Sequence, residues 1–84
     1  MQNHIEEADD LVIRFKQETL LEIFEHEDVE LHAPVEERFD LGEEVEVTVF
    51  GVDPDRLDVQ FGDGSIAFIR REQVEIVKIN DEIV

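Results

Sequence analysis

The 84-residue chain contains no cysteine, no tryptophan and no tyrosine, and only seven lysines and arginines. Without cysteine it has no disulfide scaffold, no Cys-ligated zinc site and no thiol nucleophile. With so few cations it lacks the clustered Lys and Arg that bind nucleic-acid phosphates or an anionic membrane surface. No apolar run approaches the ~20 residues that cross a bilayer, and the first residues lack a signal-peptide pattern. We therefore expect a cytoplasmic protein, or one made inside an infected cell.

Acidic residues are abundant, since 24 Asp and Glu against seven Lys and Arg give a formal net charge of −17. The hydrophobic fraction of 42% is nevertheless sufficient for a folded core. A chain this short buries only about 60–65% of its unfolded surface, so the core must be small. Uncompensated charge opposes compaction, and added salt should screen part of that repulsion. We expect function to reside at the surface.

The apolar pattern divides the chain into an acidic N-terminal segment that we expect to be frayed, residues 1–10, and a single small domain, residues 11–84. Within the domain, Leu11, Ile13 and Phe15 alternate with polar residues. A period of two predicts a strand with one buried face.

Residues 17–28 fit a short helix. Two leucines and Phe24, at spacings i, i+1 and i+4, share one helical face. Thr19 and Glu22 have the spacing of a capping box at the start of a helix.

The competing interpretation of this stretch is a second strand over residues 19–25, with Leu21 and Ile23 pointing inward. Glu and Leu dominate the stretch and β-branched residues are few. Local propensity therefore favours the helix.

Apolar residues alternate in short segments along the rest of the chain, which predicts strands at residues 29–33, 45–49, 57–61, 65–71 and 74–79. Pro34 ends the first of these, Gly51 and residues 53–55 break the second, and residues 62–64 (Gly-Asp-Gly) form a hairpin turn. The connections are too short for parallel crossovers. The expected fold is α+β or mostly β: a strand and a short helix, followed by a four- to five-stranded antiparallel meander that curls into a small barrel or is covered by the helix.

Motifs for catalysis or metal binding are incomplete. His26 begins a segment similar to a zinc-protease helix, but Glu30 occupies the position of the second histidine. The segment from Asp53 has Asp58 and Gly64 where a calcium loop needs glycine and glutamate. We expect no enzyme activity, no catalytic residue, no metal site and no cofactor.

The acids recur at regular spacing. Glu44 and Glu46, on the outward face of one predicted strand, would stand ~6.6 Å apart, close to two phosphate steps of ~3.4 Å. On the predicted helix, Glu18, Glu22 and Glu25 would lie ~5–6 Å apart. Such rows can imitate a phosphate backbone and occupy the basic cleft of a nucleic-acid enzyme, and the net charge would accelerate the encounter.

Salt adaptation is the competing explanation for the acidity. An acid-rich, lysine-poor surface keeps a protein soluble in a salt-loaded cytoplasm, and only Lys16 and Lys78 among the basic residues are lysines. Composition alone does not separate this explanation from mimicry of nucleic acid.

Residues 11–13 (Leu-Val-Ile) and 17–21 (Gln-Glu-Thr-Leu-Leu) resemble the phage uracil-DNA glycosylase inhibitors. In that family a strand reading Leu-Val-Ile-Gln-Glu-Ser-Ile-Leu leads to an acidic helix, and an antiparallel sheet follows. The Gln-Glu-Ser edge enters the DNA-binding cleft of the glycosylase, and an apolar pocket binds a leucine of the enzyme.

By this resemblance an edge contact and its flanking charge are carried by Gln17, Glu18, Thr19, Glu22 and Glu25. The sequence departs from the family pattern in three respects. Residues 14–16 (Arg-Phe-Lys) interrupt the run, and the proline that opens the family's helix is absent. Met1 is the only methionine, so the methionines of the family's pocket have no counterpart.

Residues 39–47, 63–69 and 73–77 are similar in layout to an SH3-like small barrel, which often enters its second strand through a Gly-Asp/Glu turn. The resemblance implies architecture alone. Peptide-binding members use an aromatic stripe, and this chain has neither Trp nor Tyr.

We thus expect a non-enzymatic acidic domain, a DNA mimic that inhibits a DNA-handling enzyme by occupying its basic cleft. The alternative is a salt-adapted SH3-like interaction module with an unrelated partner. Either function requires a protein partner, with no direct contact to nucleic acid or membrane. The residues expected to bind the partner are Gln17, Glu18, Thr19, Glu22, Glu25, Glu44 and Glu46.

Overall fold

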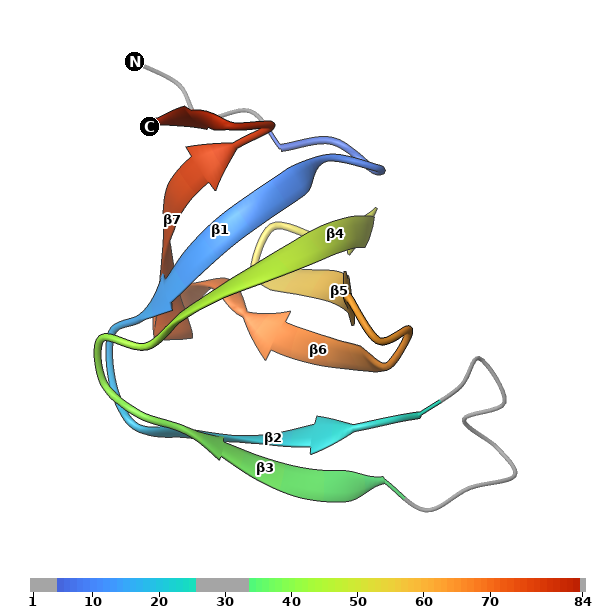
Figure 1. Cartoon of the computed structure of the whole chain (residues 1–84), viewed down its shortest axis with the longest axis vertical. Coiled ribbons are helices and arrows are strands. Elements are labelled where there is room, and N and C mark those ends of the chain that lie inside the picture. Colours follow the sequence, from blue (N-terminus) through green and yellow to red (C-terminus); the bar gives the residue numbers. More distant parts are fainter. Residues whose placement is uncertain (1–4, 26–33, 84) are drawn as a thin grey trace.

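A computed structural model describes residues 5–25 and 34–83 of the chain (Figure 1). Its elements are strands β1 (Asp10–Phe15), β2 (Thr19–Ile23), β3 (Val35–Phe39), β4 (Glu44–Val52), β5 (Arg56–Phe61) and β6 (Ile66–Arg70), the 3-10 turn η1 (Arg71–Gln73), and strands β7 (Val74–Ile79) and β8 (Glu82–Ile83). The described part of the chain is therefore mostly β, which is one of the two fold classes expected from the sequence.

The strands form two antiparallel sheets. The larger has the order β6-β5-β4-β1-β7-β8, and the smaller is the β2–β3 hairpin. In Figure 1 the hairpin lies as a separate layer at the bottom of the view, with β3 outermost. A single bridge between Phe24 and Ile66 joins the end of β2 to β6, with N···O distances of 2.9 and 2.8 Å.

The core lies between the two sheets and is built from the inward side of each strand. Leu11, Ile13 and Phe15 of β1 are buried, as their alternation predicted. Phe39, at the end of β3, stacks on Phe15 with ring centroids 4.7 Å apart, and its ring centroid lies 6.2 Å from that of Phe61. These ring contacts attach the hairpin to the large sheet.

The predicted helix over residues 17–28 is wrong for the described residues. Residues 19–23 form β2, with Leu21 and Ile23 buried and Leu20 and Glu22 exposed, which confirms the competing strand interpretation. The reason is non-local, because β3 provides both a hydrogen-bonding ladder and a buried aromatic face. Residues 26–28 lie outside the described residues.

Thr19 does not cap a helix. Its side chain is buried, and its hydroxyl donates a hydrogen bond of 3.0 Å to the carbonyl of Gln17. The hydroxyl thus holds the turn between β1 and β2.

Strand β3 is not predicted by the sequence pattern. The strand predicted at residues 29–33 lies outside the described residues, and β3 begins directly after Pro34. Four of its five residues are exposed, so its burial follows no simple alternation.

Turns in the second half follow the glycines. Residues 62–64 connect β5 to β6 as predicted, with Gly64 at a φ of 92°. Asp63 accepts hydrogen bonds from the hydroxyl and backbone N–H of Ser65, and these bonds lower the pKa of its carboxyl group.

Strand β4 does not break at Gly51 but continues to Val52 through a bulge between Val49 and Gly51. A Cβ at this glycine would overlap the Asp58 carboxylate of the neighbouring strand. A larger residue at this position would require the Asp58 side chain to move.

The acidic N-terminal segment contributes to the core where it is described. Ile5 is buried in the core cluster, and the N–H of Ala8 donates to the carbonyl of Val49 at 2.7 Å. Among residues 5–25 and 34–83, no helix has the length and apolar character needed to cross a membrane.

Candidate acidic interaction surface

The residues expected to bind a partner fall into two groups in the structure. The first group belongs to the β2–β3 hairpin and its entry, and the second belongs to β4 of the large sheet. The hairpin group consists of Gln17, Glu18, Thr19, Glu22 and Glu25, and the sheet group of Glu44 and Glu46.

The hairpin carries an acidic surface on the side away from the core. Glu22 of β2 lies directly opposite Glu36 of β3, and Leu20 lies opposite Arg38. Directly opposed side chains have Cβ atoms ~4.5–5.5 Å apart and share one face of the ladder. These two pairs form the centre of the hairpin outer face.

Arg38 brings two more carboxylates to this face. Its guanidinium lies 3.8 Å from Glu18 and 3.5 Å from Asp40, the residues just before β2 and just after β3. We define the hairpin outer face as six residues: Glu18, Leu20, Glu22, Glu36, Arg38 and Asp40.

The whole hairpin region is strongly negative. Residues 16–25 and 34–43 contain seven acids and two cations, so their formal charge is 2 − 7 = −5. No described cation forms an ion pair with Glu22 or Glu36. Leu20 is 58% exposed between these acids, so an apolar side chain lies within the acidic face.

The remaining residues of the hairpin group differ in exposure. Gln17 and Glu25 are exposed at the two ends of β2. Thr19 is only 3% exposed, and its hydroxyl is already bonded to Gln17. The buried Thr19 side chain therefore stabilises the turn before β2.

Sequence reasoning missed Glu36 and Asp40 of this face. Val35 and Phe39 flank three consecutive charged residues, so no alternation of apolar and polar residues predicts a strand there. Three consecutive charged residues resemble a solvated loop.

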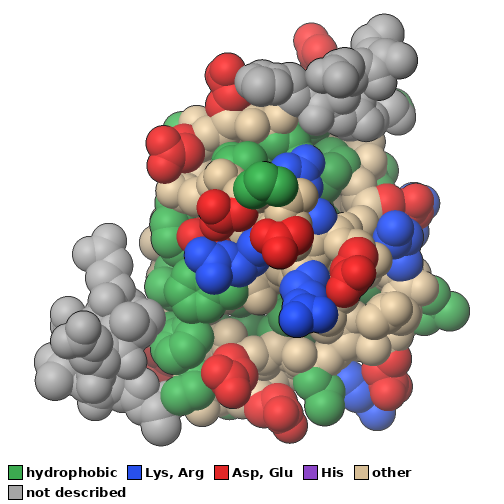
Figure 2. Space-filling view, turned by 180° about the vertical axis from the view of Figure 1, so that it is seen from behind, with side chains coloured by type: hydrophobic (Ala, Val, Ile, Leu, Met, Phe, Trp, Pro, Cys, Tyr) green, Lys and Arg blue, Asp and Glu red, His purple; other side chains and the backbone are tan. Residues whose placement is uncertain are grey.

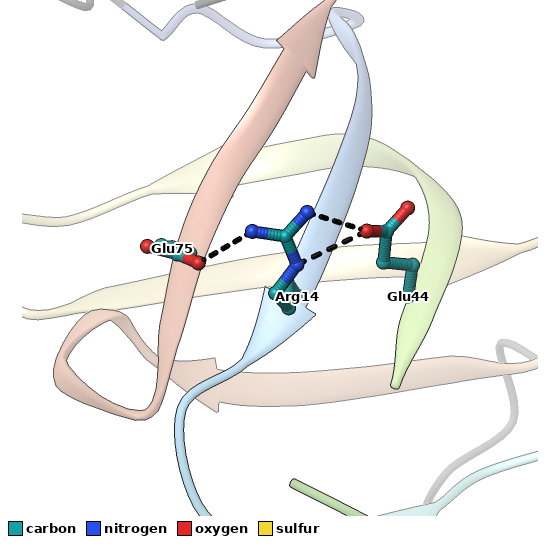
Figure 3. A network of polar contacts seen from close by, with 3 residues as sticks. All are labelled: Arg14, Glu44 and Glu75. Atoms are coloured by element: carbon teal, nitrogen blue, oxygen red, sulfur yellow. Dashed lines mark hydrogen bonds and ion pairs between the residues drawn. The ribbon is translucent and has the colours of Figure 1, made fainter. Parts of the chain in front are cut away.

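In the sheet group, Glu44 is held by a cation. Arg14 of β1 donates to Glu44 at 2.7 and 3.0 Å and to Glu75 of β7 at 2.9 Å, so its guanidinium bridges three strands (Figure 3). The bonds to Glu44, and then to Glu75, raise the pKa of Arg14. The Glu44–Glu46 row is therefore partly neutralised.

Glu46 lies beside a shallow recess on the outer side of the large sheet. Val12 of β1 pairs with Glu46 of β4 on one side and with Lys78 of β7 on the other. All three residues line the recess, whose volume is about 290 Å³. Lys78 therefore lies on the same face of the sheet as Glu46, with Val12 between them.

The two groups do not form one surface. Val47 of β4 and Leu21 of β2 belong to the same buried core, from which Glu46 and Glu22 point away on different sheets. The structure keeps the hairpin acids together and separates them from the acids of β4.

Cations elsewhere are interleaved with acids. Figure 2 shows one face on which Lys and Arg side chains lie among Asp and Glu side chains, beside a group of hydrophobic side chains. Arg56 lies 2.9 Å from Asp58 and 3.4 Å from Asp53, and its guanidinium lies 5.3 Å from the ring centroid of Phe68. A mixed surface of this kind differs from the hairpin outer face.

Metal-binding geometry is absent from the described ranges, 5–25 and 34–83, which hold no group of three side chains placed to ligate an ion. All three histidines, including His26, lie outside these ranges.

Comparison of the chain with protein-family models, with curated proteins and with solved structures returned no match.

Proposed function

We propose that this protein is a non-enzymatic binding domain that presents the hairpin outer face to a basic surface of a partner protein. The observation that carries the proposal is the pairing of Glu22 with Glu36 across the ladder. Like charges directly opposite one another destabilise a sheet, and a cation from a partner would remove that cost. The net charge of −17 favours rapid encounter with such a partner.

The partner surface that fits best is the nucleic-acid-binding cleft of a DNA-handling enzyme. Carboxylates on this face are separated by ~5 Å across the ladder and, because Leu20 or Arg38 lies between them, by ~13 Å along a strand. Cations placed for phosphates ~3.4 Å apart along one strand can meet the acids of one strand at every fourth position. The resemblance of residues 17–21 to the uracil-DNA glycosylase inhibitors makes a glycosylase the first enzyme to test.

A second candidate is a salt-adapted interaction module with SH3-like architecture. The order β6-β5-β4-β1-β7 and the 3-10 turn before β7 support that architecture. The interleaved cations and acids of Figure 2 favour this candidate, because they belong to a surface charged for solvation.

A retention experiment with purified proteins separates the two candidates. The wild type, the double variant Glu22→Gln/Glu36→Gln and the control Glu7→Gln/Glu82→Gln are immobilised, and a uracil-DNA glycosylase and other DNA-binding enzymes are applied at 50 mM and 500 mM salt. The control removes two exposed acids outside the hairpin and has the same net charge as the hairpin variant.

The proposal expects retention at low salt by the wild type and the control, weaker retention by the hairpin variant, and displacement by duplex DNA. Equal weakening of both variants, or an enzyme that duplex DNA does not displace, would contradict DNA mimicry and support the interaction module.

A further inference from the structure

Strand β3 has a free edge. Among the described residues it pairs only with β2, and Val35, Glu36, Glu37 and Arg38 are all exposed. Figure 1 shows β3 as the outermost strand of the hairpin layer. Alternate residues of such a strand direct unpaired backbone N–H and C=O groups outward.

The other edges in the described structure are less open to a new strand. Strand β6 is bridged by Phe24, whose backbone exchanges two hydrogen bonds with Ile66. Strand β8 has only two residues. The β3 edge is five residues long, which is enough for a ladder with an added segment.

The negative charge of β3 determines which kind of segment can pair with its free edge. Two copies of β3 placed edge to edge would bring Glu36 and Glu37 of one chain against the same acids of the other, in addition to the repulsion between two molecules of charge −17. A segment bearing Lys or Arg would instead be attracted. Val35 is 54% exposed at the start of the edge and can contact an apolar residue of the segment.

We propose that β3 accepts an extended basic segment of a partner protein as a third strand of the hairpin sheet. Backbone hydrogen bonds provide the register, Glu36 and Glu37 select lysine or arginine, and Val35 selects an apolar neighbour. This inference rests on the proposed function, since it names the part of the partner that meets the acidic hairpin. Pairing of this kind requires free backbone N–H groups on the partner, whereas binding by charge attraction alone does not.

Two synthetic peptides of equal charge test the requirement. The first is a nine-residue peptide with the repeat Lys-Lys-Val, and the second has the same sequence with every backbone amide N-methylated. Affinities are measured at 50 mM salt for the wild type, for Glu36→Gln/Glu37→Gln and for the control Glu7→Gln/Glu82→Gln. Amide hydrogen exchange of the ¹⁵N-labelled protein locates the binding site.

The proposal expects at least tenfold tighter binding of the unmethylated peptide, with slowed exchange at alternate amides of β3. It also expects Glu36→Gln/Glu37→Gln to weaken binding several-fold more than the control does. Equal affinity for the two peptides, or protection confined to β6 or β8, would overturn edge pairing. A concentration-dependent dimer of the free protein with protected β3 amides would identify a second copy as the occupant and also overturn it.

The outcomes separate this inference from the proposed function. If both peptides bind equally and both lose affinity in Glu36→Gln/Glu37→Gln, binding by the acidic hairpin is supported and pairing along the β3 edge is contradicted. If neither peptide depends on the hairpin acids, both proposals fail.

Discussion

Phe39, the last residue of β3, stacks on Phe15, the last residue of β1, with an angle of 17° between the two ring planes. Both side chains are at most 5% exposed. This contact joins the acidic hairpin to the large sheet, and the position of the hairpin outer face depends on it.

Replacing Phe39 with leucine should therefore loosen the hairpin. We expect a loss of about 0.5–1.5 kcal/mol in the free energy of unfolding from the aromatic contacts alone, measured by urea denaturation. Faster amide exchange in β2 and β3 than in β1 should accompany the loss. The control is Phe50→Leu, because Phe50 is 43% exposed and has no ring partner in the described structure. Equal losses for the two variants would contradict the anchoring role.

Replacing Glu36 with lysine should stabilise the fold. The substitution converts a like-charge pair with Glu22 into an opposite-charge pair, for which we expect a gain of about 0.2–1 kcal/mol at low salt. The matched control is Glu37→Lys, which makes the same change of charge opposite Leu21. Denaturation at 20 mM and 1 M salt is the measurement, and the gain should shrink at high salt. An equal gain from Glu37→Lys would show that only net charge matters.

The turn at Asp63 should make part of the stability depend on pH. Its hydrogen bonds to Ser65 lower the pKa of the carboxyl group in the folded state. The ionised carboxylate therefore contributes to the free energy of unfolding at pH values above its unfolded-state pKa of about 3.9. This contribution is lost as the pH falls through the lowered folded pKa. Asp63→Asn should therefore unfold at lower urea concentration than the wild type at pH 7, with a difference that shrinks below about pH 3.9.

Asp55→Asn is the control for Asp63→Asn, because it removes an equal charge from another exposed turn. A difference between wild type and Asp63→Asn that stays constant from pH 7 to pH 3 would rule out the carboxylate as its source.

Salt should raise the melting temperature, because screening weakens repulsion among the uncompensated acids. For a surface shaped to bind a partner, we expect most of the gain below about 0.5 M KCl, where the Debye length has already fallen to a few ångströms. A melting temperature that keeps rising steadily to molar KCl would favour the salt-adapted module. Sodium chloride in parallel separates screening from an effect specific to potassium.

Much of the large sheet follows from local pattern. Leu57 and Val59 alternate with polar residues over a whole strand, and Gly62 and Gly64 flank the tight turn that follows. In these segments one periodicity fits and the turn residues agree with it, so no distant contact is needed to identify the strands.

Residues 19–23 lacked such a unique pattern. The segment Leu-Leu-Glu-Ile fits both one face of a helix and an alternating strand. It forms a strand because it pairs with β3, whose first residue lies twelve positions beyond the end of β2. Local propensity favoured the helix, but the ladder with β3 and the burial of Leu21 and Ile23 outweighed it.

The candidate site shows the same limit. Spacing along β4 correctly placed Glu44 and Glu46 on an exposed face, but it contained no information about Arg14, which the β1–β4 register puts beside Glu44. Similarly, Glu22 and Glu36 are fourteen positions apart in the chain, and only the hairpin register makes them neighbours. Charge partners across a sheet are set by register, which the sequence pattern does not specify.

The most direct test of the central claim is a hydrogen–deuterium exchange footprint of this protein bound to a DNA-binding enzyme that it retains at low salt. The account predicts slowed exchange in residues 18–22 and 35–40, with β5, β6 and β8 unchanged. Protection over β5 and β6, with the hairpin exchanging as in the free protein, would contradict it.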